Sequence, residues 1–266
     1  MTSSLQREQT WRLRGEGITA GYGDGEAVLD DVHVGIRKGS FTAIIGPNAC
    51  GKSTLLRTLA RVMRPAAGQV LIDGADVAGM RARDLAVRLG MLPQSPAVPE
   101  GITVLDLVSR GRYPHQSVFS PWSREDEQVV AAAMDRTGVR DLAARPVDTL
   151  SGGQRQRVWI AMALAQDTEL LLLDEPTTFL DITHQIEVLR LLRELQRSGR
   201  TVVAVLHELN QAARFATDVI ALREGRVIAT GTPAQLFTPP TMREVYDLDC
   251  RVIRDPETDS PVVLPR

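Results

Sequence analysis

The stretch Gly46-Pro47-Asn48-Ala49-Cys50-Gly51-Lys52-Ser53-Thr54 decides the fold. It follows the pattern Gly-x-x-x-x-Gly-Lys-Ser/Thr, which forms a loop that binds phosphate groups when a strand precedes it and a helix follows it. The apolar run Phe41–Ile45 precedes it, and an apolar repeat at helical spacing runs from Leu55 to Val62 after it. The sequence therefore predicts a strand, a phosphate-binding loop and a helix in succession.

The residue types in this loop suit a nucleotide phosphate. Glycines let several backbone N–H groups point inward, and the following helix adds its positive N-terminal end. Lys52 supplies a full positive charge for the β- and γ-phosphates, and the Ser53 hydroxyl is a hard oxygen ligand for Mg²⁺. The alternative is a glycine-rich turn that carries a solvated lysine.

Nearly continuous apolar runs elsewhere indicate more strands of the same sheet. Leu170–Leu173 and Thr201–Leu206 are typical of parallel strands covered on both faces. Between them, Thr183–Ser198 has apolar residues at helical spacing, with a stop signal at Gly199. This order predicts a strand, helix and strand unit of an α/β fold.

Other segments have different patterns. Trp11–Thr19 and Val28–Arg37 alternate and flank a glycine-rich turn, so they predict antiparallel strands. Near the other end of the chain, a hairpin is expected at Asp218–Thr230 around Glu224-Gly225. The region from Pro96 to Leu150 contains helical patterns at 103–110 and 125–137 and predicts a helical insertion.

Composition limits the class of protein. The chain has 266 residues, 31 Lys and Arg, 33 Asp and Glu, and 43% hydrophobic residues. A disordered chain or a nucleic-acid binder that relies on bulk positive charge would have a different balance. The longest apolar run, Val158–Ala165, is far shorter than the roughly 20 residues of a membrane span. No secretory leader is expected at the N-terminus, and a disulfide between Cys50 and Cys250 is not expected in a reducing compartment.

Two carboxylates follow the apolar run at 170–173. Asp174 would hold Mg²⁺ at the end of a strand that neighbours the phosphate loop. Glu175 follows at once and suits a general base that orients an attacking water molecule. The alternative is a solvated acidic turn. The long interval between Lys52 and Asp174 accommodates the helical insertion.

A second glycine-containing element precedes this strand. Leu150-Ser151-Gly152-Gly153-Gln154 stands before a helical pattern at 155–166, and Ser151 is a suitable N-cap. Free N–H groups and the helix dipole make such a start a small anion site. An ordinary capped helix after a loop would have the same local sequence.

Together these motifs resemble those of the ABC (ATP-binding cassette) ATPases. Leu150–Gln154 with Gln156 resembles the signature motif of that family. The remaining family elements follow along the whole chain: Gln94 resembles the Q-loop glutamine, Leu180-Asp181 the D-loop, His207 the switch histidine and Tyr22 the aromatic residue that stacks on adenine.

The resemblance implies an α/β P-loop NTPase (RecA-like) core with an antiparallel β subdomain and an inserted α-helical subdomain. On this basis residues 11–95 and 151–240 form the nucleotide-binding core with its β subdomain. Residues 96–150, running into the signature helix to about 166, form the helical subdomain, and 241–266 form a C-terminal tail.

The resemblance also implies a mechanism with ATP and Mg²⁺. Two copies would form a head-to-tail homodimer, with each ATP between the phosphate loop of one and the signature motif of the other. Catalysis would rest on Glu175, His207 and Gln94, and Mg²⁺ on Ser53, Gln94 and Asp174. Further nucleotide contacts would come from Tyr22, from Gly46 to Thr54, from Ser151, Gly152, Gly153 and Gln154, and from Asp181.

The expected partners are membrane-spanning permease subunits and, indirectly, a substrate-binding protein, with no nucleic acid. This places the chain at the cytoplasmic face of the cell membrane. The aromatic segment Gly111–Trp122 is a candidate part of the permease docking face; packing of a proline-containing loop is the alternative.

Finer features resemble the ATPases of ferric-siderophore importers. They include the phosphate loop itself, Gly111-Arg-Tyr-Pro-His115, Asp174–Ile182 and His184-Gln185. Importers of haem or cobalamin, exporters and soluble non-transport ABC ATPases remain as alternatives. Within the phosphate loop, the helix start and Lys52 favour a lowered pKa for Cys50, with the hypothesis that alkylation of its thiol blocks hydrolysis and that ATP protects it; the alternative is a small residue that merely fits the loop.

Overall fold

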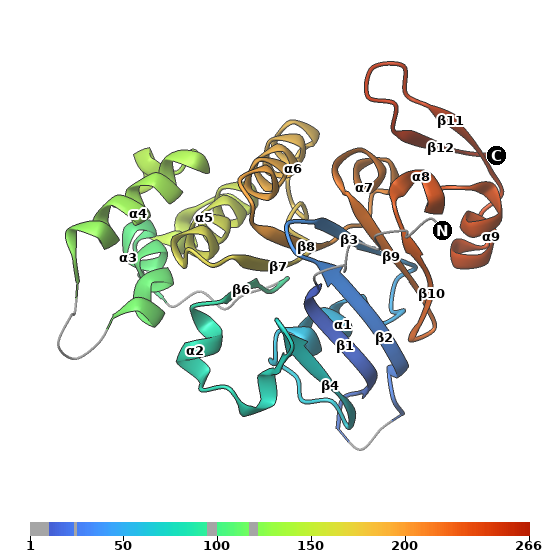
Figure 1. The fold of residues 1–266 in the computed structure, drawn as a ribbon. Helices are drawn as coiled ribbons and strands as arrows, with labels where there is room; N and C mark the ends of the chain where they lie inside the picture. The colour runs from blue at the N-terminus through green and yellow to red at the C-terminus, as the bar shows by residue number, and fades with distance from the viewer. Residues whose placement is uncertain (1–10, 24–25, 95–99, 117–121) are drawn as a thin grey trace, which may run out of the picture.

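The computed structural model describes residues 11–23, 26–94, 100–116 and 122–266. Within these residues, no helix combines the length and the apolar character that a membrane span needs. The described chain forms two main β-sheets, a helical region at one end and a C-terminal group of short elements at the other (Figure 1).

The larger sheet has the order β10-β9-β3-β8-β7-β6, and all neighbours except β9 and β10 are parallel. Its strands are β10 (Arg226–Gly231), β9 (Asp218–Arg223), β3 (Phe41–Ile45), β8 (Thr201–Val205), β7 (Leu170–Asp174) and β6 (Leu89–Leu92). The apolar runs expected as strands are therefore confirmed, as is the hairpin at 218–230. The strand β6 has no counterpart among the predicted elements.

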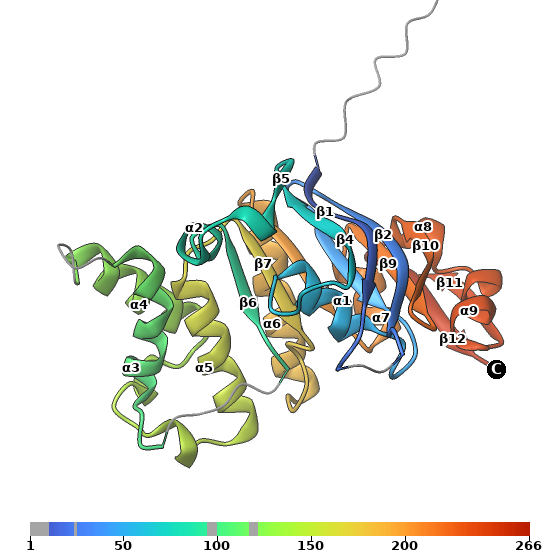
Figure 2. The same ribbon diagram turned by 90° about the horizontal axis from the view of Figure 1, so that it is seen from below.

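Every residue of β3, β7 and β8 is buried, which explains their continuous apolar sequence. Successive residues of β3 pack alternately into two hydrophobic cores, one on each face of the sheet. Ile44 belongs to the core shared with α1 (Lys52–Leu59), whereas Ala43 and Ile45 belong to the core on the other face. Figure 2 shows α1 on one side of this sheet and α6 (Ile182–Arg197) on the other.

The smaller sheet has the order β2-β1-β4-β5 and is antiparallel. Its strands are β2 (Leu29–Arg37), β1 (Trp11–Ala20), β4 (Ala67–Ile72) and β5 (Ala75–Asp76). The two antiparallel strands expected near the N-terminus are confirmed as β1 and β2.

The helix after the phosphate loop is shorter than expected. It ends at Leu59, because Arg61 adopts a left-handed conformation with φ of 57°. Val62 is 68% exposed, so its assignment to the apolar face of this helix is wrong.

The helical region contains α3 (Val104–Ser109), α4 (Arg124–Arg136) and α5 (Gly152–Ala165). These three helices contact one another, and their buried residues extend the larger hydrophobic core. Within 100–116 and 122–150, the described residues contain no strand, as expected for the insertion.

The remaining elements are short. They are α2 (Ala82–Ala86), α7 (Leu209–Phe215), α8 (Pro233–Leu236), α9 (Pro239–Tyr246), β11 (Cys250–Arg254) and β12 (Pro261–Pro265). β11 and β12 form a separate antiparallel hairpin, so the segment expected as a tail is folded. Helix α9 spans position 241, where the sequence placed the start of that tail.

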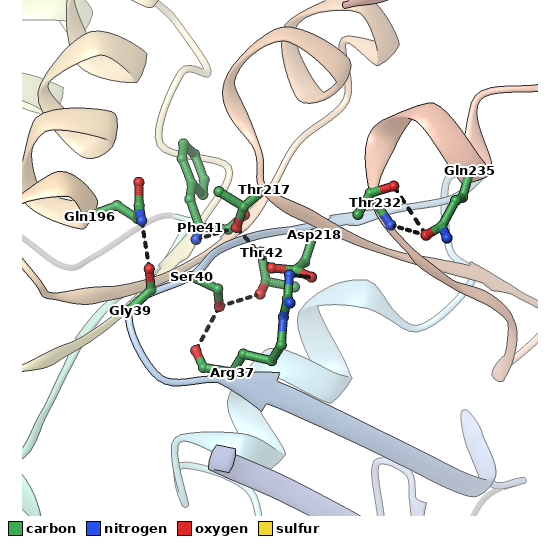
Figure 3. A network of polar contacts seen from close by, with 10 residues as sticks. All are labelled: Arg37, Gly39, Ser40, Phe41, Thr42, Gln196, Thr217, Asp218, Thr232 and Gln235. Atoms are coloured by element: carbon green, nitrogen blue, oxygen red, sulfur yellow. Dashed lines mark hydrogen bonds and ion pairs between the residues drawn. The ribbon is translucent and has the colours of Figure 1, made fainter. Parts of the chain in front are cut away.

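A polar network fixes the amino ends of the central strands (Figure 3). The Arg37 guanidinium, at the end of β2, pairs with Asp218 at the start of β9. Thr217 Oγ1 accepts a hydrogen bond from the N–H of Phe41 at 2.9 Å, which ties β9 to the start of β3. Gln196 of α6 donates to the Gly39 carbonyl at 2.5 Å. With their starts aligned, the parallel strands present their carboxyl ends at one edge of the sheet.

Candidate active site

The phosphate-binding loop connects β3 to α1 and requires unusual backbone conformations. Gly46 and Gly51 have φ of 151° and 102°, and Ala49 has φ of 62°. A Cβ atom on Gly46 would lie 2.2 Å from the carbonyl oxygen of Leu222, so only glycine fits there. The expected strand, loop and helix are therefore present in the required order.

Lys52 is buried under this loop. Its ammonium donates hydrogen bonds to the carbonyl oxygens of Gly46 at 2.9 Å and Pro47 at 2.7 Å. These acceptors carry no charge, so neither contact neutralises the ammonium. A buried cation whose contacts are neutral oxygens favours binding of an anion beside it.

Ser53 and Asp174 lie together at the end of β7. Ser53 Oγ donates a hydrogen bond to Asp174 Oδ1 at 2.7 Å. Asp174 is fully buried, and its Oδ2 has no hydrogen-bond partner among the described residues; the guanidinium of Arg57 is 3.9 Å away. Burial raises the pKa of the Asp174 carboxyl above its ordinary value of 3.8. A buried carboxylate oxygen without a partner, next to a hydroxyl, fits the oxygen donors that Mg²⁺ prefers.

Glu175 is held between two neighbouring strand ends. Its Oε1 lies 2.6 Å from Nε2 of His207, which follows β8. Its Oε2 accepts hydrogen bonds from the side-chain amide of Gln94, which follows β6, at 2.8 Å and from Thr178 at 3.1 Å. The three residues expected to act in catalysis therefore meet at the carboxyl edge of the parallel sheet.

These groups line one cleft of about 670 Å³. It contains Lys52, Ser53, Gln94, Glu175 and His207, and its other lining residues are Tyr22, Val28, Asn48, Ala49, Gly51 and Thr54. Tyr22 is 52% exposed, and its hydroxyl oxygen accepts hydrogen bonds from Arg57 at 3.1 Å and Thr54 at 3.4 Å. The exposed aromatic ring thus lies at the same cleft as the phosphate loop.

The signature motif is not part of this cleft. Ser151 caps α5 as expected: its hydroxyl accepts from the N–H of Gln154, and the Gln154 side chain accepts from the N–H of Ser151. Gly152 and Gly153 lie against Phe179 and Leu180, and Asp181 caps α6 and pairs with His184. Ser151, Gly152 and Phe179 are all exposed, so this group forms a separate surface.

Sequence reasoning missed three side chains of the site. Arg57 contacts Tyr22 and approaches Asp174, Thr178 supports Glu175, and Val28 lines the cleft. For two of these residues, the spacing from a predicted site residue could have indicated a role. Arg57 is one helical turn after Ser53, and Thr178 is three residues after Glu175.

The lowered pKa expected for Cys50 is wrong, whereas the alternative of a small residue that fits the loop agrees with its burial. Its thiol is 5% exposed, and burial raises its pKa, which outweighs the opposing effect of Lys52. A thiol that stays protonated is a poor nucleophile. Cys50 and Cys250 are both free, as expected.

We expect both thiols of the folded chain to react with a disulfide reagent more slowly than a free cysteine does, by roughly tenfold or more. Both are buried, so access requires local opening of the structure. The measurement is the rate of thiol release before and after denaturation. Rapid labelling of Cys50 in the folded chain would contradict its burial.

The fold and the cleft together define a P-loop nucleotide hydrolase. Comparison with known proteins identifies the family within this class. The model of the ABC transporter family matches residues 29–178, more than half of the chain. The chain belongs to the ABC transporter family, and it is an ABC ATPase that binds ATP.

The ferric enterobactin transport ATP-binding protein FepC of Escherichia coli (strain K12) is 54% identical over 97% of this chain and 95% of its own length. The solved structure of an inward-facing ABC transporter of the metal-chelate type is 30% identical, with a TM-score of 0.81 and coverage of 97% and 98% of the two chains. The dimeric structure of the ABC transporter cassette MJ0796 is 29% identical, with a TM-score of 0.75 over 83% of this chain and 98% of that one.

Proposed function

We propose that this chain is the ATP-hydrolysing subunit of a membrane importer for ferric siderophores. The observation that carries the hydrolytic part is the placement of Glu175, between His207 and Gln94 and next to the Ser53–Asp174 pair. The cargo rests on the 54% identical relative, whose name states ferric enterobactin transport.

The phosphate loop and Tyr22 would bind the nucleotide. Lys52 would turn its ammonium to the β- and γ-phosphates while the loop N–H groups surround them. The residues assigned to this role are Gly46, Pro47, Asn48, Ala49, Cys50, Gly51, Lys52, Ser53 and Thr54. Tyr22 would stack on adenine, because its ring is exposed at the same cleft.

Ser53, Asp174 and Gln94 would hold Mg²⁺. The ion, when bound, neutralises charge on the phosphate oxygens during transfer. Glu175 would accept a proton from the attacking water molecule, and His207 would hold water and phosphate in line. The 2.6 Å contact between His207 and Glu175 keeps the base oriented toward the cleft.

Asp174→Asn is expected to abolish Mg²⁺-dependent hydrolysis and yet stabilise the nucleotide-free chain. The raised pKa means that the buried carboxylate opposes folding once the pH exceeds its ordinary value of 3.8. Removing that charge should raise the free energy of unfolding by about 1 kcal/mol, which corresponds to a rise in Tm of roughly 2–4 °C. Thermal unfolding at pH 7 and pH 4 measures this, and the gain should shrink at the lower pH. A lower Tm at pH 7 would contradict the account.

Two copies of the chain would complete the site. Ser151, Gly152, Gly153, Gln154 and Asp181 lie on a surface outside the cleft of their own chain. In a head-to-tail homodimer this surface would reach the γ-phosphate bound by the other copy, and the dimeric structure of a related cassette supports this arrangement. Release of the γ-phosphate would then open the dimer.

Permease subunits would hold the homodimer at the cytoplasmic face of the cell membrane. A substrate-binding protein would act on the other side, without touching this chain, and no nucleic acid takes part. Tyr113 and Trp122 are 60% and 41% exposed and are candidates for the docking face; Phe119, between them, lies outside the described residues.

The proposal is tested by purifying the chain with its permease and reconstituting both into liposomes with the substrate-binding protein. The expected result is ATP-dependent uptake of iron bound to a siderophore, with none for the Glu175→Gln variant. Uptake of haem or cobalamin instead would show that the assignment of the cargo is wrong. Export of a compound by the reconstituted complex would overturn the importer assignment.

A further inference from the structure

Helices α6 and α7 each follow a strand that ends at the proposed active site, and they lie next to each other. Both pack into the larger hydrophobic core on one face of the larger sheet (Figure 1). Helix α6 begins directly after the segment 175–181, which contains Glu175 and Asp181. Helix α7 begins two residues after His207. The segments that hold the proposed base and its histidine therefore continue into neighbouring helices.

A side-chain hydrogen bond joins these two helices. Gln211 Nε2, on α7, donates to Gln185 Oε1, on α6, at 2.7 Å. Gln185 Nε2 in turn donates to the backbone carbonyl oxygen of Leu180 at 3.0 Å. Leu180 immediately precedes Asp181, the N-cap of α6. Two consecutive hydrogen bonds thus run from α7 to the end of the segment 175–181.

The same two parts of the chain also meet at the cleft. Nε2 of His207 lies 2.6 Å from Oε1 of Glu175, at the start of the segment 175–181. The glutamine pair connects the other end of that segment, at Leu180, with α7. The two connections close a ring. The position of α7 relative to this segment therefore determines both how His207 meets Glu175 and where Asp181 lies.

The opposite side of α7 is anchored to the C-terminal hairpin. Asn210 Oδ1 accepts a hydrogen bond from the N–H of Val263 at 2.8 Å, and Asn210 Nδ2 donates to the Val263 carbonyl oxygen at 3.3 Å. Helix α7 also packs against β3. Because these contacts hold α7 in place, loss of the glutamine pair is expected to loosen the segment 175–181 rather than the helix.

The surroundings of Gln211 indicate that its amide does more than fill space. The residue is 9% exposed, and its Oε1 has no hydrogen-bond partner among the described residues. A buried amide oxygen without a donor destabilises a fold relative to an apolar side chain of the same size. Packing alone would therefore favour an apolar residue here, and what the amide adds is its directed bond to Gln185.

We propose that Gln185 and Gln211 are positioning residues that couple His207 to Asp181. They touch no substrate; they hold the helix that follows His207 in register with the segment that carries Glu175 and Asp181. The pair thereby links the catalytic cleft of one chain to the surface proposed to face the other copy. This inference rests on the proposed function of that cleft.

The test replaces Gln211 by methionine in the full chain assembled with its permease. Methionine keeps the length of the side chain and removes its hydrogen bond. We expect kcat for ATP hydrolysis to fall roughly threefold to tenfold, the factor of one net hydrogen bond. The Kd for Mg·ADP should equal that of wild type, because neither glutamine lines the cleft.

A second readout does not depend on activity. The N–H groups of Thr178 and Leu180 donate to carbonyl oxygens within the segment 175–181. In the nucleotide-free chain, these two amides should exchange their hydrogens faster in Gln211→Met than in wild type, because the segment opens more often.

A double-mutant cycle ties the effect to the glutamine pair. Gln185→Met breaks both hydrogen bonds, so it should lower kcat at least as much as Gln211→Met does. The double variant should be no slower than Gln185→Met, because the bond is already lost. The control is Gln196→Met, the same substitution near the other end of α6, where the amide donates to the Gly39 carbonyl oxygen. It should keep the wild-type kcat and the wild-type exchange of Thr178 and Leu180.

The outcomes separate this inference from the proposed function. A wild-type kcat in Gln211→Met, or unchanged exchange of Thr178 and Leu180, would overturn the inference. Single effects that multiply in the double variant, a parallel loss of Mg·ADP affinity, or an equal fall of kcat in Gln196→Met would do the same. Absence of ATP hydrolysis by the assembled wild-type chain would overturn the proposed function instead, and the exchange measurement would still decide whether Gln211 holds the segment.

Discussion

Replacing Glu175 by glutamine is expected to reduce ATP hydrolysis by about a hundredfold to ten-thousandfold, the usual contribution of a general base. Glutamine has nearly the same shape and can keep a contact with Gln94 or His207, but it cannot accept a proton at neutral pH. ATP binding should therefore persist. Phosphate release at saturating ATP measures the change.

The matched control is Glu194→Gln, the same substitution at an exposed position on α6. Its turnover should equal that of wild type. Hydrolysis at the wild-type rate in Glu175→Gln would show that another group activates water.

Replacing Lys52 by alanine is expected to weaken ATP binding by about tenfold to a hundredfold or more. A hydrogen bond to a charged group contributes about 1.5–3 kcal/mol, and the variant loses a buried ammonium positioned under the loop. The variant also leaves the carbonyl oxygens of Gly46 and Pro47 without their donor. Equilibrium binding of a fluorescent ATP analogue measures the loss.

Lys38 is the only other lysine in the sequence and is exposed at the end of β2. Lys38→Ala should bind ATP as wild type does. Similar affinities in Lys52→Ala and wild type would remove the phosphate loop from the binding site.

The sequence predicts those residues of the site whose positions depend on one local feature. Such a feature is a backbone conformation that only glycine adopts, or the end of one buried strand. The glycines at 46 and 51, the buried run before them and the acidic end of β7 are such features, because few other structures fit them. The meeting of Gln94, Glu175 and His207 follows once their strands are parallel neighbours.

The rest depends on contacts between segments far apart in the chain. β4 buries only its last three residues, and β6 and α2 have only four and five residues, so their sequence patterns are too weak to identify and packing selects their structure. The protonated state of Cys50 is set by burial under the β9–β10 turn, which local sequence does not reveal. Folding of the residues after 240 likewise depends on distant contacts, since α9 packs against β9 and β10 and β12 packs against α7.

The central claim is that two copies of this chain share each ATP, and light scattering of Glu175→Gln tests it most directly. With saturating Mg·ATP we expect twice the 29.1 kDa monomer mass, and the monomer mass without nucleotide. Adding Gly153→Asp, which places a negative charge on the signature surface, should keep the ATP-bound chain monomeric. A monomer mass for the ATP-saturated Glu175→Gln chain would contradict the shared site.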